Sequence, residues 1–94
     1  MINYNIKYSK CFKKQLKKVI KQGKDINKLF YVVELLSKGI ELDVKYKDHS
    51  LLDNKYYKNC RECHIEPDWL LVWEQNDNEF TLLLLETGTH SDLF

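Results

Sequence analysis

The C-terminal part of the chain reads CRECHIEPDWLLVWEQNDNEFTLLLLE from Cys60 to Glu86. It contains three strand-like segments separated by turn residues: Cys60–Ile65, Trp69–Gln75 and Phe80–Glu86. Pro67 has no N–H for a sheet ladder and suits the turn between the first two segments. Asn76-Asp77-Asn78 suits a hairpin turn between the last two. The pattern therefore predicts strands gathered at the end of the chain.

Two further elements are predicted near the N-terminus. Asn3–Tyr8 alternates polar and apolar residues, as a half-buried strand does. Ser9 offers an N-cap hydroxyl, and the apolar residues behind it recur at helical spacing: Phe12, Leu16, Val19 and Ile20. This spacing predicts a helix from about Lys10 to Gln22, with Gly23 as its stop.

A second amphipathic helix is predicted after Gly23. Asp25 or Asn27 can cap it, and it ends before Gly39. Its apolar stripe consists of Ile26, Leu29, Phe30, Val33 and Leu36. Joined at Gly23, the two helices form a predicted helical hairpin. The next segment, Ile40–Lys58, has no clear periodicity and is typical of a loop that carries function.

The resulting element order is β-α-α-β-β-β in a chain of 94 residues, which is long enough for one hydrophobic core. We predict a single α+β domain over residues 1–94. Its two N-terminal helices pack on one face of a small, mostly antiparallel sheet.

The charge of the chain is divided along its length. The formal net charge is only +1, but all 15 basic residues lie before Glu62, together with 6 acidic ones, for a local charge of +9. From Glu62 onward there are 8 acidic residues and no lysine or arginine, for a local charge of −8. Eight lysines and no acid fall between Lys7 and Lys24. Most of these lysines fall in the helix predicted from Lys10 to Gln22. They form either a solvated helix face or a surface that follows a nucleic-acid backbone.

The cysteines and the apolar runs bear on the compartment. The longest uninterrupted apolar run, Leu82–Leu85, is far shorter than the roughly 20 residues of a membrane span. The N-terminus has no apolar segment typical of a signal peptide. An odd number of cysteines, Cys11, Cys60 and Cys63, does not form the even disulfide framework of a small secreted protein. We therefore expect a cytoplasmic protein without membrane contact.

Residues Cys60–His64 match C-x-x-C-H, the spacing of a c-type haem attachment site. That interpretation is disfavoured, because attachment requires export and the only methionine is Met1. In a strand, residues three apart point to opposite faces, so Cys60 and Cys63 are also a poor zinc or redox pair. We expect both to be small, semi-buried apolar residues.

Three histidines and one aspartate are the candidates for chemistry. His64 and Asp68 flank the first strand turn, His90 follows the last strand, and His49 lies in the preceding loop. These positions can meet at one edge of the sheet. Imidazoles titrate near neutrality and can transfer protons in both directions, as phosphodiester cleavage without a metal requires. A zinc site with three histidines and an aspartate is the competing use of the same residues.

The aromatic residues divide into two groups. Trp73 and Phe80 lie within strand patterns and are expected in the core. Tyr46, Tyr56, Tyr57 and Phe94 lie outside those patterns, the tyrosines beside lysines. Rings in such places either stack on unpaired bases or pack at the periphery of the core, and the sequence leaves both open for the tyrosines.

Several motifs together resemble a known family. Three motifs resemble, in order and spacing, those of the YafQ branch of the RelE/ParE toxin superfamily. They are YKDHSLL at Tyr46–Leu52, RECHIEPDWLLVW at Arg61–Trp73 and TGTHSDLF at Thr87–Phe94. The segments YSKCFKKQLKK and KDINKL are similar to its two N-terminal helices. The resemblance covers nearly the whole chain.

This resemblance implies the toxin of a type II toxin–antitoxin pair. Such a toxin is a metal-independent endoribonuclease, an mRNA interferase without a cofactor, that cuts mRNA in the ribosomal A site. Its implied partners are a cognate antitoxin, ribosomal RNA and, through the antitoxin only, operator DNA. The positions that match the family's catalytic and RNA-contacting residues are His49, His64, Asp68, His90 and Phe94.

A reaction follows from these residue types. The RNA 2′-OH attacks the adjacent phosphate, one group accepts the hydroxyl proton, and another protonates the departing 5′ oxygen. We assign His90 as the acid, and Asp68, His64 and His49 as the base and the orienting groups. Phe94 stacks on a base to hold the phosphate in line, and the lysine-rich helix contacts the ribosomal RNA backbone.

Glu86 departs from the family pattern, in which many members carry an arginine just before T-G-T/S-H. A carboxylate cannot stabilise the extra negative charge of a pentacovalent phosphate as a guanidinium does. Either Lys47, Lys55 or Arg61 supplies this positive charge, or the chain is a slower enzyme. The alternative is an antitoxin-binding protein of the same fold that lacks nuclease activity or inhibits another target.

Overall fold

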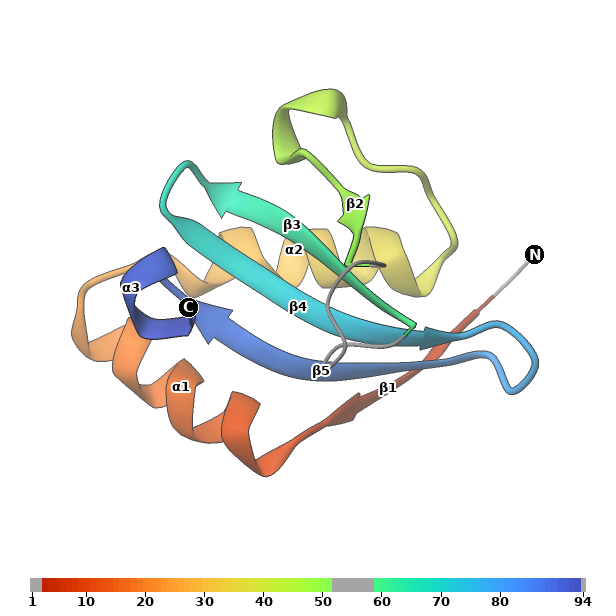
Figure 1. The fold of residues 1–94 in the computed structure, drawn as a ribbon, viewed down its shortest axis with the longest axis horizontal. Helices are drawn as coiled ribbons and strands as arrows, with labels where there is room; N and C mark the ends of the chain where they lie inside the picture. The colour runs from red at the N-terminus through yellow and green to blue at the C-terminus, as the bar shows by residue number, and fades with distance from the viewer. Residues whose placement is uncertain (1–2, 52–58, 94) are drawn as a thin grey trace.

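A mixed sheet forms the centre of the computed structural model, which describes residues 3–51 and 59–93. The elements of the described part are β1 (Asn5–Tyr8), α1 (Lys10–Lys21), α2 (Ile26–Ser37), the 3-10 helix η1 (Val44–Tyr46), β2 (His49–Ser50), β3 (Cys60–Glu66), β4 (Trp69–Asn76), β5 (Thr81–Gly88) and α3 (His90–Leu93). Five strands in this part form one sheet of order β1-β5-β4-β3-β2 (Figure 1). The predicted α+β class is confirmed.

The strands β3, β4 and β5 form the antiparallel centre of the sheet that the sequence pattern predicts. β1 pairs with β5 in parallel at one edge, and the two-residue β2 pairs with β3 at the other. The β4–β5 turn follows Asn76, whose Oδ1 accepts hydrogen bonds from the backbone N–H groups of Asn78 and Glu79, both at 3.0 Å. This asparagine holds the hairpin closed.

The two long helices begin at the residues that the sequence predicts. Ser9 Oγ accepts from the N–H of Phe12 at 2.9 Å, and Asp25 Oδ1 accepts from the N–H of Asn27 at 3.0 Å. Gly23 follows α1 with φ +81°, a backbone conformation that side chains with a Cβ rarely adopt. From this turn α1 packs on β5 and α2 on β3.

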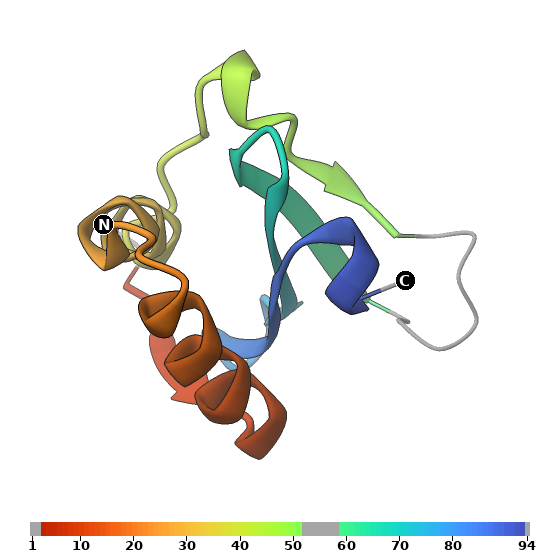
Figure 2. The same ribbon diagram turned by 90° about the vertical axis from the view of Figure 1, so that its left-hand side faces the viewer.

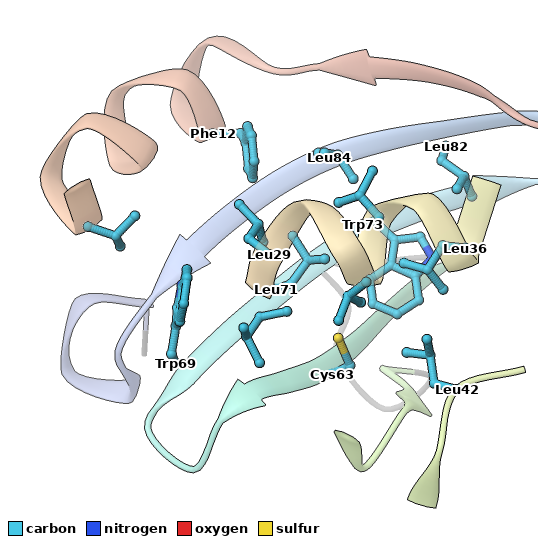
Figure 3. Close-up of a cluster of buried hydrophobic side chains, with 14 residues drawn as sticks. Phe12, Leu29, Leu36, Leu42, Cys63, Trp69, Leu71, Trp73, Leu82 and Leu84 are labelled. Carbon is cyan, nitrogen blue, oxygen red and sulfur yellow. The ribbon is translucent and has the colours of Figure 1, made fainter. Parts of the chain in front are cut away.

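The core lies between the helices and one face of the sheet. Both helices lie on the same side of the sheet (Figure 2). The buried side chains between them come from α1, α2 and from alternate positions of three strands (Figure 3): Phe12, Leu29, Leu36, Cys63, Trp69, Leu71, Trp73, Leu82 and Leu84 among them. Trp73 and Cys63 are therefore in the core, as expected. The opposite face of the sheet lies outside this core.

Thr87 ties three elements together inside the protein. Its side chain is 1% exposed, and its Oγ1 accepts from the indole N–H of Trp69 at 2.9 Å and donates to the carbonyl of Leu70 at 2.8 Å. Its backbone N–H donates to the side-chain oxygen of Gln15 on α1 at 3.0 Å. Every one of these polar groups has a partner, so their burial does not destabilise the fold.

Three sequence expectations are wrong in detail. Phe80 is not in the core, because it lies in the β4–β5 turn at φ +51°, 48% exposed, with its ring 6.0 Å from that of Tyr4. Ile40–Lys58 is not entirely loop, since it includes η1 and β2. The short helix α3 after β5 has no counterpart in the predicted order.

The described residues include no helix that is long and apolar enough to cross a membrane.

Thr87→Val keeps the shape of the side chain but removes its hydroxyl. The indole N–H of Trp69 then has no partner in the core, and we expect the free energy of unfolding to fall by about 1–3 kcal/mol. Denaturant titration followed by tryptophan fluorescence measures the change. Thr81→Val, at the partly exposed start of the same strand, is the matched control and should change it by less than about 0.5 kcal/mol. Equal stability of the two variants would contradict the role of Thr87.

Candidate active site

The end of the sheet at the β3–β4 turn brings together three of the four predicted residues. Asp68 Oδ1 lies 3.0 Å from His90 Nδ1 and also accepts from the backbone N–H of His90 at 3.2 Å. The rings of His64 and His90 have their centroids 5.6 Å apart. Residues from β3, the β3–β4 turn and α3 therefore converge, as predicted.

The fourth residue, His49, lies on the neighbouring strand β2. It pairs with Glu62 of β3, and His49 Nε2 is 3.5 Å from Glu62 Oε1. Glu62 is two residues before His64, so alternation along the strand places both on the same sheet face. His49 therefore shares the face of His64 but is separated from it by the position of Glu62.

Each histidine has one nitrogen whose role the geometry defines. Nδ1 of His49 lies 2.7 Å from the carbonyl of Lys47, and Nδ1 of His64 lies 3.2 Å from the carbonyl of Pro67. A carbonyl only accepts, so both Nδ1 atoms carry their proton and donate it. The Nδ1 of His90 donates in the same way to the Asp68 carboxylate. In the neutral rings of His64 and His90, Nε2 is the nitrogen free of a proton, and it is the atom that can serve as a base.

Asp68 is the orienting partner of His90. The hydrogen bonds from the ring and the backbone of His90 lower the pKa of the Asp68 carboxyl below its ordinary value. Asp68 therefore remains ionised at neutral pH, and the pair is lost only as the pH falls through this lowered pKa. The carboxylate holds the His90 ring in the tautomer that carries its proton on Nδ1.

Two carboxylates lie on the same sheet face as the histidines. The pairing register aligns His49, Glu62, Val72 and Glu86 across four strands. Glu62 is buried, and Glu86 Oε1 accepts a long hydrogen bond of 4.0 Å from the thiol of Cys11 on α1. Glu62 is not among the predicted site residues, although its position two residues before His64 in a strand is a signal that places it on the same face.

Arg61, Lys47 and Lys55 are the residues proposed to supply the positive charge of the family arginine, and the structure places only the first two. Arg61 pairs with Trp73, which places it on the helix side of the sheet, and its guanidinium binds Asp48 at 2.9 Å. It is therefore not at the histidines. Lys47 contributes its carbonyl to His49 and lines, together with His64, a groove of about 680 Å³ between α2, η1 and the β3–β4 turn. Lys55 lies outside the described residues.

The aromatic candidates divide similarly. Tyr46 packs partly against the core, with Lys45 Nζ 5.2 Å from its ring centroid, which matches peripheral packing. Tyr56, Tyr57 and Phe94 lie outside the described residues.

Two of the three cysteines are buried apolar residues. Cys60 and Cys63 are buried, and burial is the main cause that raises the pKa of both thiols. A protonated thiol is a poor metal ligand and a poor nucleophile. Among residues 3–51 and 59–93, no group of three or more histidines, cysteines or carboxylates could hold a metal ion, so the proposed zinc site is not formed there.

Comparisons with known proteins place the chain in one family. A family model described as the bacterial toxin of a type II toxin–antitoxin system, YafQ, matches residues 4–94. The mRNA interferase toxin YafQ of Escherichia coli strain B / BL21-DE3 is 43% identical over 96 residues, which cover 100% of this chain and 99% of that protein.

Two solved structures are similar over nearly their whole length. A metal-bound toxin from Helicobacter pylori has a TM-score of 0.89 and 44% identity, covering 97% of this chain and 99% of that one. YafQ in the E. coli DinJ-YafQ toxin-antitoxin complex has a TM-score of 0.87 and 39% identity, covering 99% of both chains. The fold and the matched positions define a toxin of the type II toxin–antitoxin class. Within that class, this chain belongs to the YafQ family.

The burial of the thiols predicts their reactivity. Iodoacetamide at about pH 8 should label the exposed Cys11 of the native protein and leave Cys60 and Cys63 unmodified, because alkylation needs an accessible thiolate. Peptide mass spectrometry identifies the labelled positions. The denatured chain is the control and should label at all three. Rapid native labelling of Cys63 would contradict its burial in the core.

Proposed function

We propose that this chain is an mRNA interferase that cuts translated mRNA in the ribosomal A site by attack of the 2′-OH on the adjacent phosphate. The observation that carries the proposal is the His90–Asp68 hydrogen bond of 3.0 Å beside the ring of His64. Two imidazoles at this separation can flank one phosphate, so that one accepts a proton while the other donates one.

The partners of the two rings support different roles. His90 donates to a carboxylate, which stabilises its protonated form, and we assign it as the acid that protonates the departing 5′ oxygen. His64 donates to the neutral carbonyl of Pro67, which leaves Nε2 of the neutral ring to accept the 2′-OH proton. His49, beside Glu62, is suited to hydrogen-bonding the phosphate or the ribose. This reaction needs no cofactor, and DNA, which lacks the 2′-OH, is not a substrate.

Helix α1 is the proposed contact with ribosomal RNA. Its exposed face carries Lys10, Lys13, Lys14, Lys17 and Lys21, while Phe12 and Val19 face the core. Such a face can follow phosphates without reading bases. Phe94 is proposed to stack on a base, and Lys47 and Lys55 to contact the RNA backbone.

A cognate antitoxin is the proposed protein partner. The YafQ structure in complex with DinJ supports such a partner for a chain that is 39% identical to it. The antitoxin would cover the basic surface and the active site, and would bring the pair to operator DNA. We place the protein in the cytoplasm, where translation and this partner are found.

Primer extension on an mRNA, with and without its translation, tests the proposed function. The wild-type chain should produce cuts only when the message is translated, and cutting of free mRNA or no cutting at all would contradict it. His90→Gln should lower the rate by about 10²–10⁴-fold because the acid is lost. Asp68→Asn should lower it by at least about tenfold because the imidazolium loses its carboxylate.

Asp43→Asn is the matched control for Asp68→Asn. Asp43 caps η1 with its side chain, a role that asparagine also fills, and it does not contact the histidines. The Asp43→Asn variant should cleave mRNA at the wild-type rate. A fully active His90→Gln variant would show that the acid is assigned wrongly.

Glu86 favours the second candidate, a YafQ-fold protein that binds its antitoxin without cleaving RNA. Its carboxylate lies in the same row as His49 and Glu62, where negative charge opposes a phosphate. Arg61, on the other face, does not offset it. This second candidate predicts a wild-type chain that cleaves slowly or not at all.

Glu86→Arg should increase the cleavage rate by about tenfold, because a guanidinium there stabilises the negative charge that develops on the phosphate. Glu79→Arg, in the β4–β5 turn, makes the same change of charge away from the site and is the matched control. Quantified primer extension compares both with the wild type. An equal increase in both variants would show that only net charge matters.

A further inference from the structure

The helix that carries His90 is too short to hold its own position. α3 spans four residues, His90–Leu93, and an isolated helix of one turn is unstable in water. The contacts of α3 with the rest of the protein therefore decide where the imidazole of His90 lies. These contacts come from two sides.

Asp68 binds the first residue of α3. It accepts hydrogen bonds from both the ring and the backbone N–H of His90, at 3.0 and 3.2 Å. Since Asp68 is exposed and lies in a turn, these bonds alone do not fix the direction of the helix.

Asp92, the third residue of α3, closes the N-terminal turn of this helix in a capping box with Thr89. Its Oδ2 accepts from the N–H of Thr89 at 3.2 Å, while its own N–H donates to Thr89 Oγ1 at 3.2 Å. The helix lies close to the end of β5, because a Cβ added at Gly88 would be 3.2 Å from the Cβ of Asp92.

The second oxygen of Asp92 binds a lysine of α1. Lys18 Nζ lies 2.7 Å from Asp92 Oδ1, the shortest of the ion pairs among the described residues. The hydrogen bond from Lys18 is the main cause that lowers the pKa of the Asp92 carboxyl. Figure 1 shows α3 at the same end of the molecule as the C-terminal half of α1. The carboxylate of Asp92 therefore joins the lysine-rich helix to the helix of His90.

We propose that Lys18 is a positioning residue for the reaction: through Asp92 it fixes α3 and thereby the imidazole of His90. This role rests on the proposed function. It separates Lys18 from its neighbour Lys17, which is exposed and forms no ion pair among the described residues. Lys17 binds RNA, whereas Lys18 holds the acid in place.

Single-turnover cleavage of mRNA on programmed ribosomes, at varied toxin concentration, separates the two roles. Lys18→Met should lower the maximal rate by about fivefold, a modest loss because a partly exposed ion pair is weak, with the half-saturating concentration changed less than about twofold. Lys17→Met should raise the half-saturating concentration and keep the maximal rate. The same pattern in both variants would overturn the proposal.

A double-mutant cycle tests whether Lys18 acts through Asp92. Asp92→Asn keeps a capping oxygen but loses the charge that binds Lys18. Adding Lys18→Met to Asp92→Asn should lower the maximal rate no further. The single variant Lys18→Arg keeps the positive charge and should cleave at the wild-type maximal rate. Independent, multiplicative losses would overturn the proposal.

A measurement without RNA tests the positioning role of Lys18 separately from the proposed nuclease function. Backbone ¹⁵N order parameters of α3 should fall from about 0.85 to below about 0.6 in Lys18→Met. Lys38→Met removes a comparable surface ion pair, Lys38–Glu34 at 2.9 Å on α2, and should leave α3 unchanged. Unaltered order in Lys18→Met overturns the positioning role. A wild-type chain that never cuts translated mRNA instead overturns the proposed function.

Discussion

The hydroxyl of Thr87, buried between β4 and β5, is the contact on which the candidate active site depends. It accepts from Trp69 and donates to Leu70, and the adjacent N–H binds Gln15 of α1. Asp68 directly precedes Trp69, and Gly88-Thr89-His90 directly follows Thr87. A hydrogen-bonded hydroxyl in the core thus determines how the carboxylate of one turn meets the imidazole of a separate helix. A shift of register by one residue would turn these side chains to opposite faces.

The structure places the histidines and the lysines on different elements. The sheet face with the histidines also carries Glu62 and Glu86, whereas the lysines are concentrated on α1. The near-zero net charge is therefore the sum of two regions of opposite sign and not an absence of charge. In the proposed reaction, the cations that bind phosphate would come from the helix α1 beside the site. The Lys18–Asp92 pair joins α1 to α3, the helix that carries His90.

Local patterns predicted most of the elements, because their signals are local. Ser9 and Asp25 cap the helices through side chains two or three residues away from the N–H groups that they accept from. The elements that were missed depend on distant partners. β2 is only two residues long and exists because His49 and Ser50 pair with β3. α3 is held by Asp68 and Lys18, and Phe80 leaves the core because the turn needs a residue with positive φ. Neither a helical nor a strand period reports such contacts.

The class of the fold, the division of charge and the four candidate residues for proton transfer can be inferred from the sequence, because periodicity, caps and side-chain chemistry are properties of neighbouring residues. Tertiary structure decided which of them meet: Asp68 binds His90, Glu62 joins His49, and Arg61 turns away to Asp48. The physical reason is that a strand fixes the alternation of its faces locally. Its pairing partner and register are set only when the core between the helices and the sheet is packed.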